Sequence, residues 1–116
     1  MTERAFQRKV LRRLRLLGGV WVNKSPSPWD PTGIADILGT SPGVCGIFVA
    51  IELKQPGAYS DPRLGLSEPQ KRFLKKVHDA GGIAICADAW ETVDNCLAKL
   101  SGNVYPDTRP VVAQAT

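Results

Sequence analysis

The first apolar pattern along the chain has the period of an α-helix. Between residues 2 and 17 apolar side chains return every three or four positions, and two glycines follow directly. This spacing puts the apolar residues on one helix face, and glycine is common just past a helix end. The sequence therefore predicts an amphipathic helix over residues 2–17. Its apolar positions are Phe6, Val10, Leu14 and Leu17.

The next three apolar runs are short and predict β-strands. They cover residues 20–24, 33–38 and 44–54, and they contain many β-branched side chains. A segment with three prolines, residues 25–33, separates the first two runs, and a Gly-Pro turn at residues 39–43 separates the second and third. We expect the second and third strands to pair as a hairpin.

A helix, a strand and another helix follow. Ser67 and Gln70 match a capping box at the start of a helix that ends at a second glycine pair. Residues 83–87 form an uninterrupted apolar run, which is typical of a buried strand. Asp88 and Glu91 match another capping pair, which predicts that a last helix begins there.

This order of elements indicates a fold class. Helix, three strands, helix, strand and helix predict an α/β protein whose mixed central sheet is flanked by helices. The strand–helix–strand part is expected to form a right-handed crossover. The chain has 116 residues, which fits one domain, expected over residues 1–102. Residues 103–116 lose all periodicity and are expected to be a flexible tail.

Positive charge gathers on the predicted helices. The chain carries a net charge of +4, and arginines recur at helical spacing beside the apolar face of the first helix. Such a stripe suits the phosphate backbone of a nucleic acid, and it equally suits a solvated helix face, so charge alone leaves both interpretations open. The candidate DNA-contacting residues are Arg8, Arg12, Arg15, Lys24, Lys71 and Lys75.

Other features narrow the class of protein. No apolar run approaches membrane-spanning length, and the N-terminus lacks the apolar segment of a signal peptide, so we expect a cytoplasmic protein with no membrane contact. Three widely spaced cysteines without a C-x-x-C pair predict neither a disulfide framework nor a zinc site. The three tryptophans are expected to anchor the core or an interface. For Trp29, in the proline-rich segment, stacking on a nucleic acid base competes with that interpretation.

Three charged residues stand inside or at the end of apolar runs. Alternate residues of a strand share a face, so Glu52 and Lys54 point the same way, and hairpin pairing would bring Asp36 close to Glu52. Clustered carboxylates repel each other, and a divalent cation such as Mg²⁺ relieves the repulsion. A lysine beside them would orient a water or neutralise charge on a phosphate. The cluster predicts metal-assisted hydrolysis of a phosphodiester, with a turn cap and an edge-strand ion pair as the ordinary alternatives.

These residues resemble a known nuclease signature. The segments "GIAD" and "IELK" resemble the PD-(D/E)XK motif, with Ala35 in place of its proline. Together with "LSEPQKRFLKKVHDAGGIAICADAWE", they are similar to the compact VRR-NUC branch over roughly residues 3–98. The resemblance implies a restriction-endonuclease-like core. It also implies that Asp36 and Glu52 bind Mg²⁺ or Mn²⁺ with the Leu53 carbonyl as a further ligand, and that Lys54 is catalytic.

Two more residues match less specifically. Gln70 matches a glutamine that the family places at its site, but it also fits the capping box with Ser67. Glu3 matches a helix glutamate sometimes recruited as an additional metal ligand, but an acid at a helix N-terminus is also favoured by the helix dipole.

The resemblance also implies a substrate and an assembly. Stand-alone VRR-NUC members are linked to structure-selective cleavage of branched DNA, such as four-way junctions, and to homodimers. No small-molecule cofactor is expected. A homodimer also suits a protein that cuts two strands with one metal site per chain. A non-catalytic nucleic-acid-binding module, a flap or nicking nuclease that needs a partner protein, and a structural protein with an incidental acid cluster remain as alternatives.

Overall fold

The structure is a computed structural model, and it describes residues 2–24, 27–30, 32–55 and 65–101. The predicted tail, residues 103–116, lies outside the described residues, as does most of the Gly- and Pro-rich segment after Lys54. The elements are helix α1 (Glu3–Leu16), strands β1 (Val20–Asn23) and β2 (Ile37–Thr40), the 3-10 helix η1 (Pro42–Val44), strand β3 (Val49–Leu53), helix α2 (Glu68–Asp79), strand β4 (Ile83–Ala87) and helix α3 (Trp90–Leu100).

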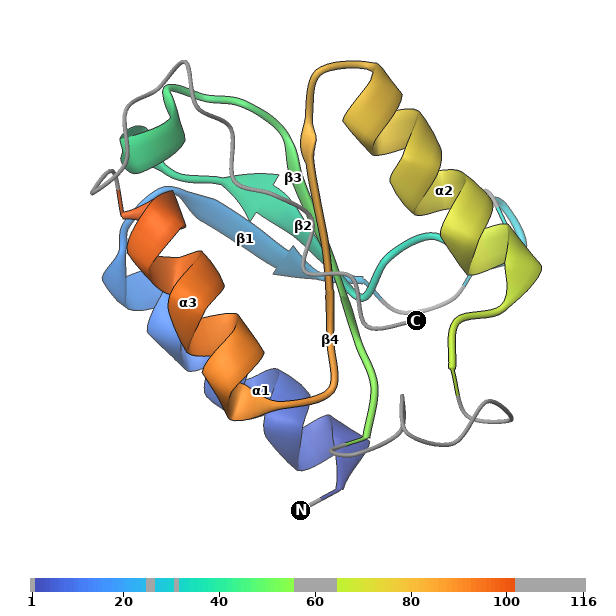
Figure 1. The fold of residues 1–116 in the computed structure, drawn as a ribbon, viewed down its shortest axis with the longest axis horizontal. Coiled ribbons are helices and arrows are strands. Elements are labelled where there is room, and N and C mark those ends of the chain that lie inside the picture. The colour runs from blue at the N-terminus through green and yellow to red at the C-terminus, as the bar shows by residue number, and fades with distance from the viewer. Residues whose placement is uncertain (1, 25–26, 31, 56–64, 102–116) are drawn as a thin grey trace.

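The four strands form one mixed sheet in the order β1-β2-β3-β4. The pairs β1–β2 and β2–β3 are antiparallel, whereas β3–β4 is parallel. Figure 1 shows α1 and α3 on one side of the sheet and α2 on the other. The predicted α/β fold, with a mixed central sheet flanked by helices, is confirmed.

The predicted periodicity of α1 is visible in what the helix buries. Phe6, Val10 and Leu14 are almost fully buried against the sheet and α3, while the arginines of the basic stripe are exposed. Thr2 caps the helix, because its hydroxyl accepts a hydrogen bond from the Ala5 N–H at 3.1 Å. The N-terminal end of α1 lies beside the carboxyl end of β3 (Figure 1).

The opposite face of the sheet carries smaller side chains. There Leu74 and Val77 of α2 pack on Ala50, Ala84 and Cys86. The start of α2 is held by the predicted capping box. The Gln70 N–H donates to the Ser67 hydroxyl at 3.3 Å, and the Ser67 N–H donates to the Gln70 side-chain oxygen at 2.8 Å.

The structure corrects the positions of the second and third strands. β2 begins at Ile37 and runs into the predicted turn, while β3 begins only at Val49. Between them the chain forms η1 and then passes through a left-handed residue, Cys45, with φ 55°. This local geometry shortens the predicted third strand, since such a backbone cannot continue a sheet. Asp36 therefore lies directly before β2 and does not interrupt it.

The predicted capping pair at Asp88 and Glu91 is wrong. The N-cap position of α3 is Ala89, and no side chain caps this end. The helix begins instead at Trp90, which packs against α1: the ring centroid lies 4.1 Å from Lys9 Nζ and 5.5 Å from Arg13 Cζ. Tertiary contact between two helices thus sets the start of α3. Among the described helices, none combines the length and apolar character needed to cross a bilayer.

Candidate active site

Two carboxylates meet where β2 begins and β3 ends. Ile37 pairs with Ile51 across these antiparallel strands, and the same register brings Asp36 opposite Glu52. The Leu53 N–H donates a hydrogen bond to Asp36 Oδ2 at 2.9 Å. The backbone of Asp36 is also held, because its carbonyl accepts from the Lys24 N–H at 2.7 Å. The predicted proximity of the two acids is therefore present, and the position of Asp36 is tied to β1 and β3.

Glu52 is a buried acid whose titration is strongly displaced. Its side chain is 2% exposed, within the face of the sheet that α2 covers. Burial, followed by a hydrogen bond and charge repulsion from Asp36, raises the pKa of Glu52 from 4.5 to about 9. Glu52 therefore keeps its proton at neutral pH in the metal-free chain.

Two further charged residues, Lys54 and Glu3, shift the pKa of Glu52 in opposite directions. The positive charge of Lys54 lowers the pKa of Glu52, and the negative charge of Glu3 raises it, but both effects are smaller than burial. Lys54 is half-buried, and its backbone N–H donates to the Ala87 carbonyl at the end of β4 at 3.0 Å. Within the described residues, no three or more His, Cys, Asp or Glu side chains are arranged together to hold a metal ion.

A cavity of about 430 Å³ opens over this pair. Gln70 lines it from the start of α2, so the glutamine reaches the site while its side-chain oxygen serves the capping box. Lys24 lines it from the end of β1. The lining residues are Lys24, Ser27, Pro28, Asp30, Thr32, Gly33, Ile34, Asp36, Glu52 and Gln70.

Asp30 is a site residue that the sequence analysis did not identify. Its Oδ2 atom lies 2.8 Å from Lys24 Nζ. This contact is an ion pair and not an aligned hydrogen bond, because the buried Oδ2 has no hydrogen-bond partner among the described groups. The signal in the sequence was an acid inside a proline-rich segment only six residues before Asp36. Lys24 is thus held at the cavity by the Asp30 carboxylate.

Gly33 fixes the loop against α2. Its backbone has φ +81°, and a Cβ atom there would come within 2.3 Å of the Pro69 carbonyl carbon and 2.6 Å of the Gln70 N. Only glycine combines this backbone conformation with so close an approach. The contact sets the distance between the loop that precedes Asp36 and the helix turn that carries Gln70.

The predicted DNA-contacting residues fall into two groups. Arg8, Arg12 and Arg15 are exposed on the outer face of α1. On α2, Lys71 Nζ lies 3.5 Å from Glu68 Oε1, and Lys75 Nζ lies 2.7 Å from Asp79 Oδ2. The Lys75 hydrogen bond lowers the pKa of Asp79. Positive charge on α2 is therefore partly balanced by its own acids, unlike the arginine stripe.

The tryptophans do not behave alike. Trp21 is 6% exposed in the core and Trp90 packs against α1, as predicted. Trp29 is 92% exposed, so it does not anchor the core, and the interface and base-stacking interpretations stay open. It stands between Pro28 and Asp30, which both line the cavity over the carboxylates.

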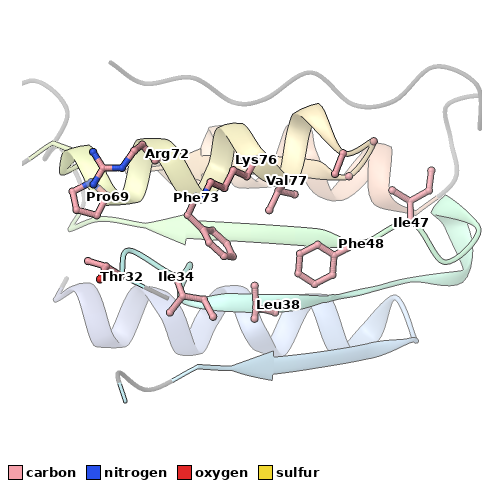
Figure 2. Close-up of a pocket in the computed structure, with 13 residues that line it drawn as sticks. Thr32, Ile34, Leu38, Ile47, Phe48, Pro69, Arg72, Phe73, Lys76 and Val77 are labelled. Carbon is pink, nitrogen blue, oxygen red and sulfur yellow. The ribbon is translucent and has the colours of Figure 1, made fainter. Parts of the chain in front are cut away.

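A larger cavity, of about 900 Å³, lies beside α2 and is apolar. Figure 2 shows the rings of Phe48 and Phe73 pointing into it, with Leu38 on the strand below. No aspartate or glutamate lines it, and it shares only Thr32 and Ile34 with the smaller cavity. Because hydrolysis needs charged and polar groups, the smaller cavity is the candidate active site.

Comparison with known proteins supports the same fold. A solved structure described as a VRR_NUC domain superposes with a TM-score of 0.64, and the match covers 84% of this chain and 96% of that chain at 21% sequence identity. No model of a protein family matches the chain, and neither does any curated protein. The chain therefore has the fold of a VRR_NUC domain, which confirms at the level of the fold the resemblance found in the sequence.

Proposed function

We propose that the chain is a metal-dependent endonuclease that hydrolyses phosphodiester bonds of DNA and prefers branched structures. One observation carries the proposal: on a VRR_NUC fold, the buried carboxyl group of Glu52 and the half-buried carboxylate of Asp36 meet at a polar cavity. Strongly displaced pKa values beside a cavity are typical of functional sites, because ordinary packing has no reason to force two acids together.

The donor atoms of this pair suit a divalent cation. Mg²⁺ and Mn²⁺ prefer carboxylate and carbonyl oxygens, and Mg²⁺ commonly uses only one or two protein carboxylates. A cation held by Asp36 and Glu52 would take the place of the Glu52 proton and would offset the repulsion between the two carboxylates, which adds to burial in raising the pKa of Glu52. The Leu53 carbonyl is the proposed further ligand. Glu3 lies close enough to repel Glu52, so it is retained as an additional ligand.

The surrounding side chains would position the substrate. When bound, the divalent cation polarises the phosphate and lowers the pKa of a water. Lys54 would orient that water or neutralise charge that develops on the phosphate. Lys24 and Gln70, which line the cavity, would hold the non-bridging oxygens; Lys24 would then exchange its contact with Asp30 for one with the phosphate.

The basic stripe of α1 supports DNA as the substrate. Arg8, Arg12 and Arg15 project from the helix whose N-terminal end lies beside the carboxyl end of β3 (Figure 1), where Glu3 acts on Glu52. Arginines at helical spacing contact the phosphate backbone without reading base sequence, which suits selection by DNA shape. Lys71 and Lys75 of α2 would add weaker contacts, since each has an acidic neighbour.

We further propose a homodimer that uses the uncovered part of the sheet. α2 packs on β3 and β4 and leaves an apolar surface over β1 and β2, made of Val20, Val22, Leu38 and Phe48. Val20 is 64% and Val22 49% exposed on β1, an outer strand with no charged residue. Two such strands can pair antiparallel about a twofold axis without like-charge repulsion, and burying this surface would offset the cost of association.

Cleavage of a labelled DNA panel tests the nuclease. Single strand, duplex, flap and four-way junction would each be incubated with Mg²⁺, with Mn²⁺ and with EDTA. Cleavage should require the metal, and Glu52→Gln should reduce it more than about 100-fold, since even an indirect ligand contact is worth 10- to 100-fold. Glu91→Gln, the same change at an exposed acid of α3, is the matched control and should cut normally.

The panel also separates the alternatives. Salt-sensitive binding of all four DNAs without cleavage would contradict the nuclease and favour a non-catalytic binding module. Cleavage of the flap or of a nicked duplex alone would replace the junction preference with a flap or nicking activity. Thermal melting adds an independent readout, because Mn²⁺ should raise the Tm of the wild type and of Glu91→Gln but not of Glu52→Gln.

Light scattering tests the homodimer. Val22→Lys should convert a wild-type dimer to a monomer, because it places a charge on each side of the proposed twofold contact. Ala98→Lys adds the same charge at an exposed position of α3, on the other side of the sheet, and should leave the dimer intact. A wild type that is monomeric at high concentration would refute the proposed assembly.

A further inference from the structure

Trp29 is the most exposed large apolar side chain among the described residues. It is 92% exposed, compared with 77% for Leu16 and 46% for Phe48. An indole ring that stays in water forgoes the large favourable free energy of burying its apolar surface, and its π faces stay without a partner. The other two tryptophans of the chain are packed, so this exposure is not a general feature of the protein.

The loop that carries Trp29 is held in place. The Trp29 N–H donates to the Ser27 hydroxyl at 3.3 Å, and the Asp30 N–H donates to the Ser27 carbonyl at 3.1 Å. Asp30 is fixed in turn by its ion pair with Lys24. The indole is therefore presented from a defined turn.

This turn forms the rim of the candidate active site. Both neighbours of Trp29, Pro28 and Asp30, line the cavity that also contains Asp36 and Glu52. A nucleotide whose phosphate lay in that cavity would carry its base a few ångströms away, within reach of the rim. The cavity beside Trp29 is lined by polar and charged side chains, among them Ser27, Asp30 and Lys24, so an apolar protein partner fits this rim less well than a nucleotide does.

We infer that Trp29 stacks on an unpaired base next to the phosphodiester bound at the candidate site. The inference rests on the proposed function and specifies its substrate: DNA with a single-stranded nucleotide at the cleaved bond. Bases inside an intact duplex are already stacked on both faces, so the indole can offer them little. At a branch, flap or gap a base has a free face, and stacking on an aromatic ring accepts any of the four bases.

Binding to two matched oligonucleotides tests this inference without depending on cleavage. Fluorescence anisotropy would compare an oligothymidylate with an abasic oligomer of the same length and charge, in EDTA. Trp29→Ala should weaken binding of the oligothymidylate about 5- to 150-fold and leave binding of the abasic oligomer unchanged. Trp29→Phe should retain most of the affinity, whereas Trp29→Leu, apolar but without a π face, should not.

The results that would contradict the stacking inference differ from those that would contradict the proposed function. Equal affinity of wild type and Trp29→Ala for the oligothymidylate, or an equal loss for both oligomers, would overturn the inference. A change in oligomeric state without a base-dependent loss would identify Trp29 as a subunit contact and would also overturn it. A wild type that shows the expected base dependence but never cleaves DNA would refute the proposed function and leave the stacking contact standing. Unchanged Tm values would verify that the variants fold.

Discussion

The two faces of the sheet differ in what they bury. The face under α1 and α3 is filled with large apolar side chains, and the face under α2 carries alanines, a cysteine and a carboxylate. A single strand, β3, supplies both: Ile51 and Leu53 point to the first face, Ala50 and Glu52 to the second. The first face thus holds the fold together. The second face leaves the space in which a charged group can stay buried and still meet a cavity.

This difference shows how a small domain accommodates an unfavourable site. Burying Glu52 beside Asp36 costs free energy, which the closely packed opposite face has to offset. Substitutions on the first face should therefore act on stability, and substitutions on the second face should act mainly on function.

The largest effect on stability is expected from the α1 face. Leu14 is fully buried there, so Leu14→Ala should lower the free energy of unfolding by about 3–5 kcal/mol through lost burial and a cavity. Phe73→Ala on the α2 face should cost less than ~2 kcal/mol, because the ring is only half-buried and already faces a cavity. Urea denaturation of both variants measures the contrast. Equal costs would contradict the division between the faces.

The second prediction concerns pH. Because the pKa of Glu52 is about 9 in the folded chain against 4.5 for the free group, the folded state holds one extra proton between these values. The stabilisation that comes from this proton is fully present below pH 4.5, and it is lost as the pH rises toward about 9. The metal-free chain should lose up to ~1.4 kcal/mol per pH unit in this window.

Urea midpoints measured across neutral pH in EDTA would check this slope. Glu52→Gln should flatten it, because the amide does not titrate. Excess Mn²⁺ should also flatten it for the wild type, since the cation displaces the Glu52 proton. A wild-type slope of zero in EDTA would show that the pKa of Glu52 is not raised in the folded chain.

A smaller effect is expected at the loop that joins the site to α2. Gly33→Ala should cost about 1–2 kcal/mol for its left-handed backbone alone, and it should also push Pro69 and Gln70 away from the cavity. Gly46→Ala is the matched control, with φ +78° but nothing within 4 Å of the added Cβ atom. Gly46→Ala should lose only the cost of its backbone conformation, whereas Gly33→Ala should lose further stability through the clash with Pro69 and Gln70 and should lose cleavage activity as well. Equal cleavage activity of the two variants would show that the contact between Gly33 and the start of α2 is not needed for function.

The smallest effect separates the two basic surfaces. Arg12→Gln should reduce the slope of log binding constant against log salt by about 0.9, the value of one phosphate contact. Lys75→Gln should reduce it less, because Lys75 is already paired with Asp79 at 2.7 Å. Titrations of duplex DNA at several salt concentrations measure both slopes. A larger change for Lys75 would place the DNA on α2.

Local rules in the sequence predicted the elements whose causes are local. The apolar period of α1 and the capping box of α2 are properties of neighbouring residues, and both are confirmed. The bounds of β2 and β3 were wrong because η1 and the left-handed Cys45 depend on how the turn packs. The start of α3 was wrong for the same kind of reason, since Trp90 packs against α1.

In the candidate site, too, the sequence predicted some residues and not others. The pairing of Asp36 with Glu52 followed from strand alternation and the hairpin, so the sequence was sufficient. Asp30 was not identified, and the sequence left the role of Trp29 open, because nothing in a proline-rich segment states which side chains turn toward a cavity and which toward water.

By itself, the sequence determined the α/β order, the two helix faces and the meeting of two acids, because these follow from periods and spacings a few residues long. Only the tertiary structure decided that Glu52 is buried with a raised pKa, that Lys24 is held by Asp30, and that the polar cavity rather than the larger apolar one faces the acids. Burial, pKa and cavity shape depend on groups brought together from distant parts of the chain.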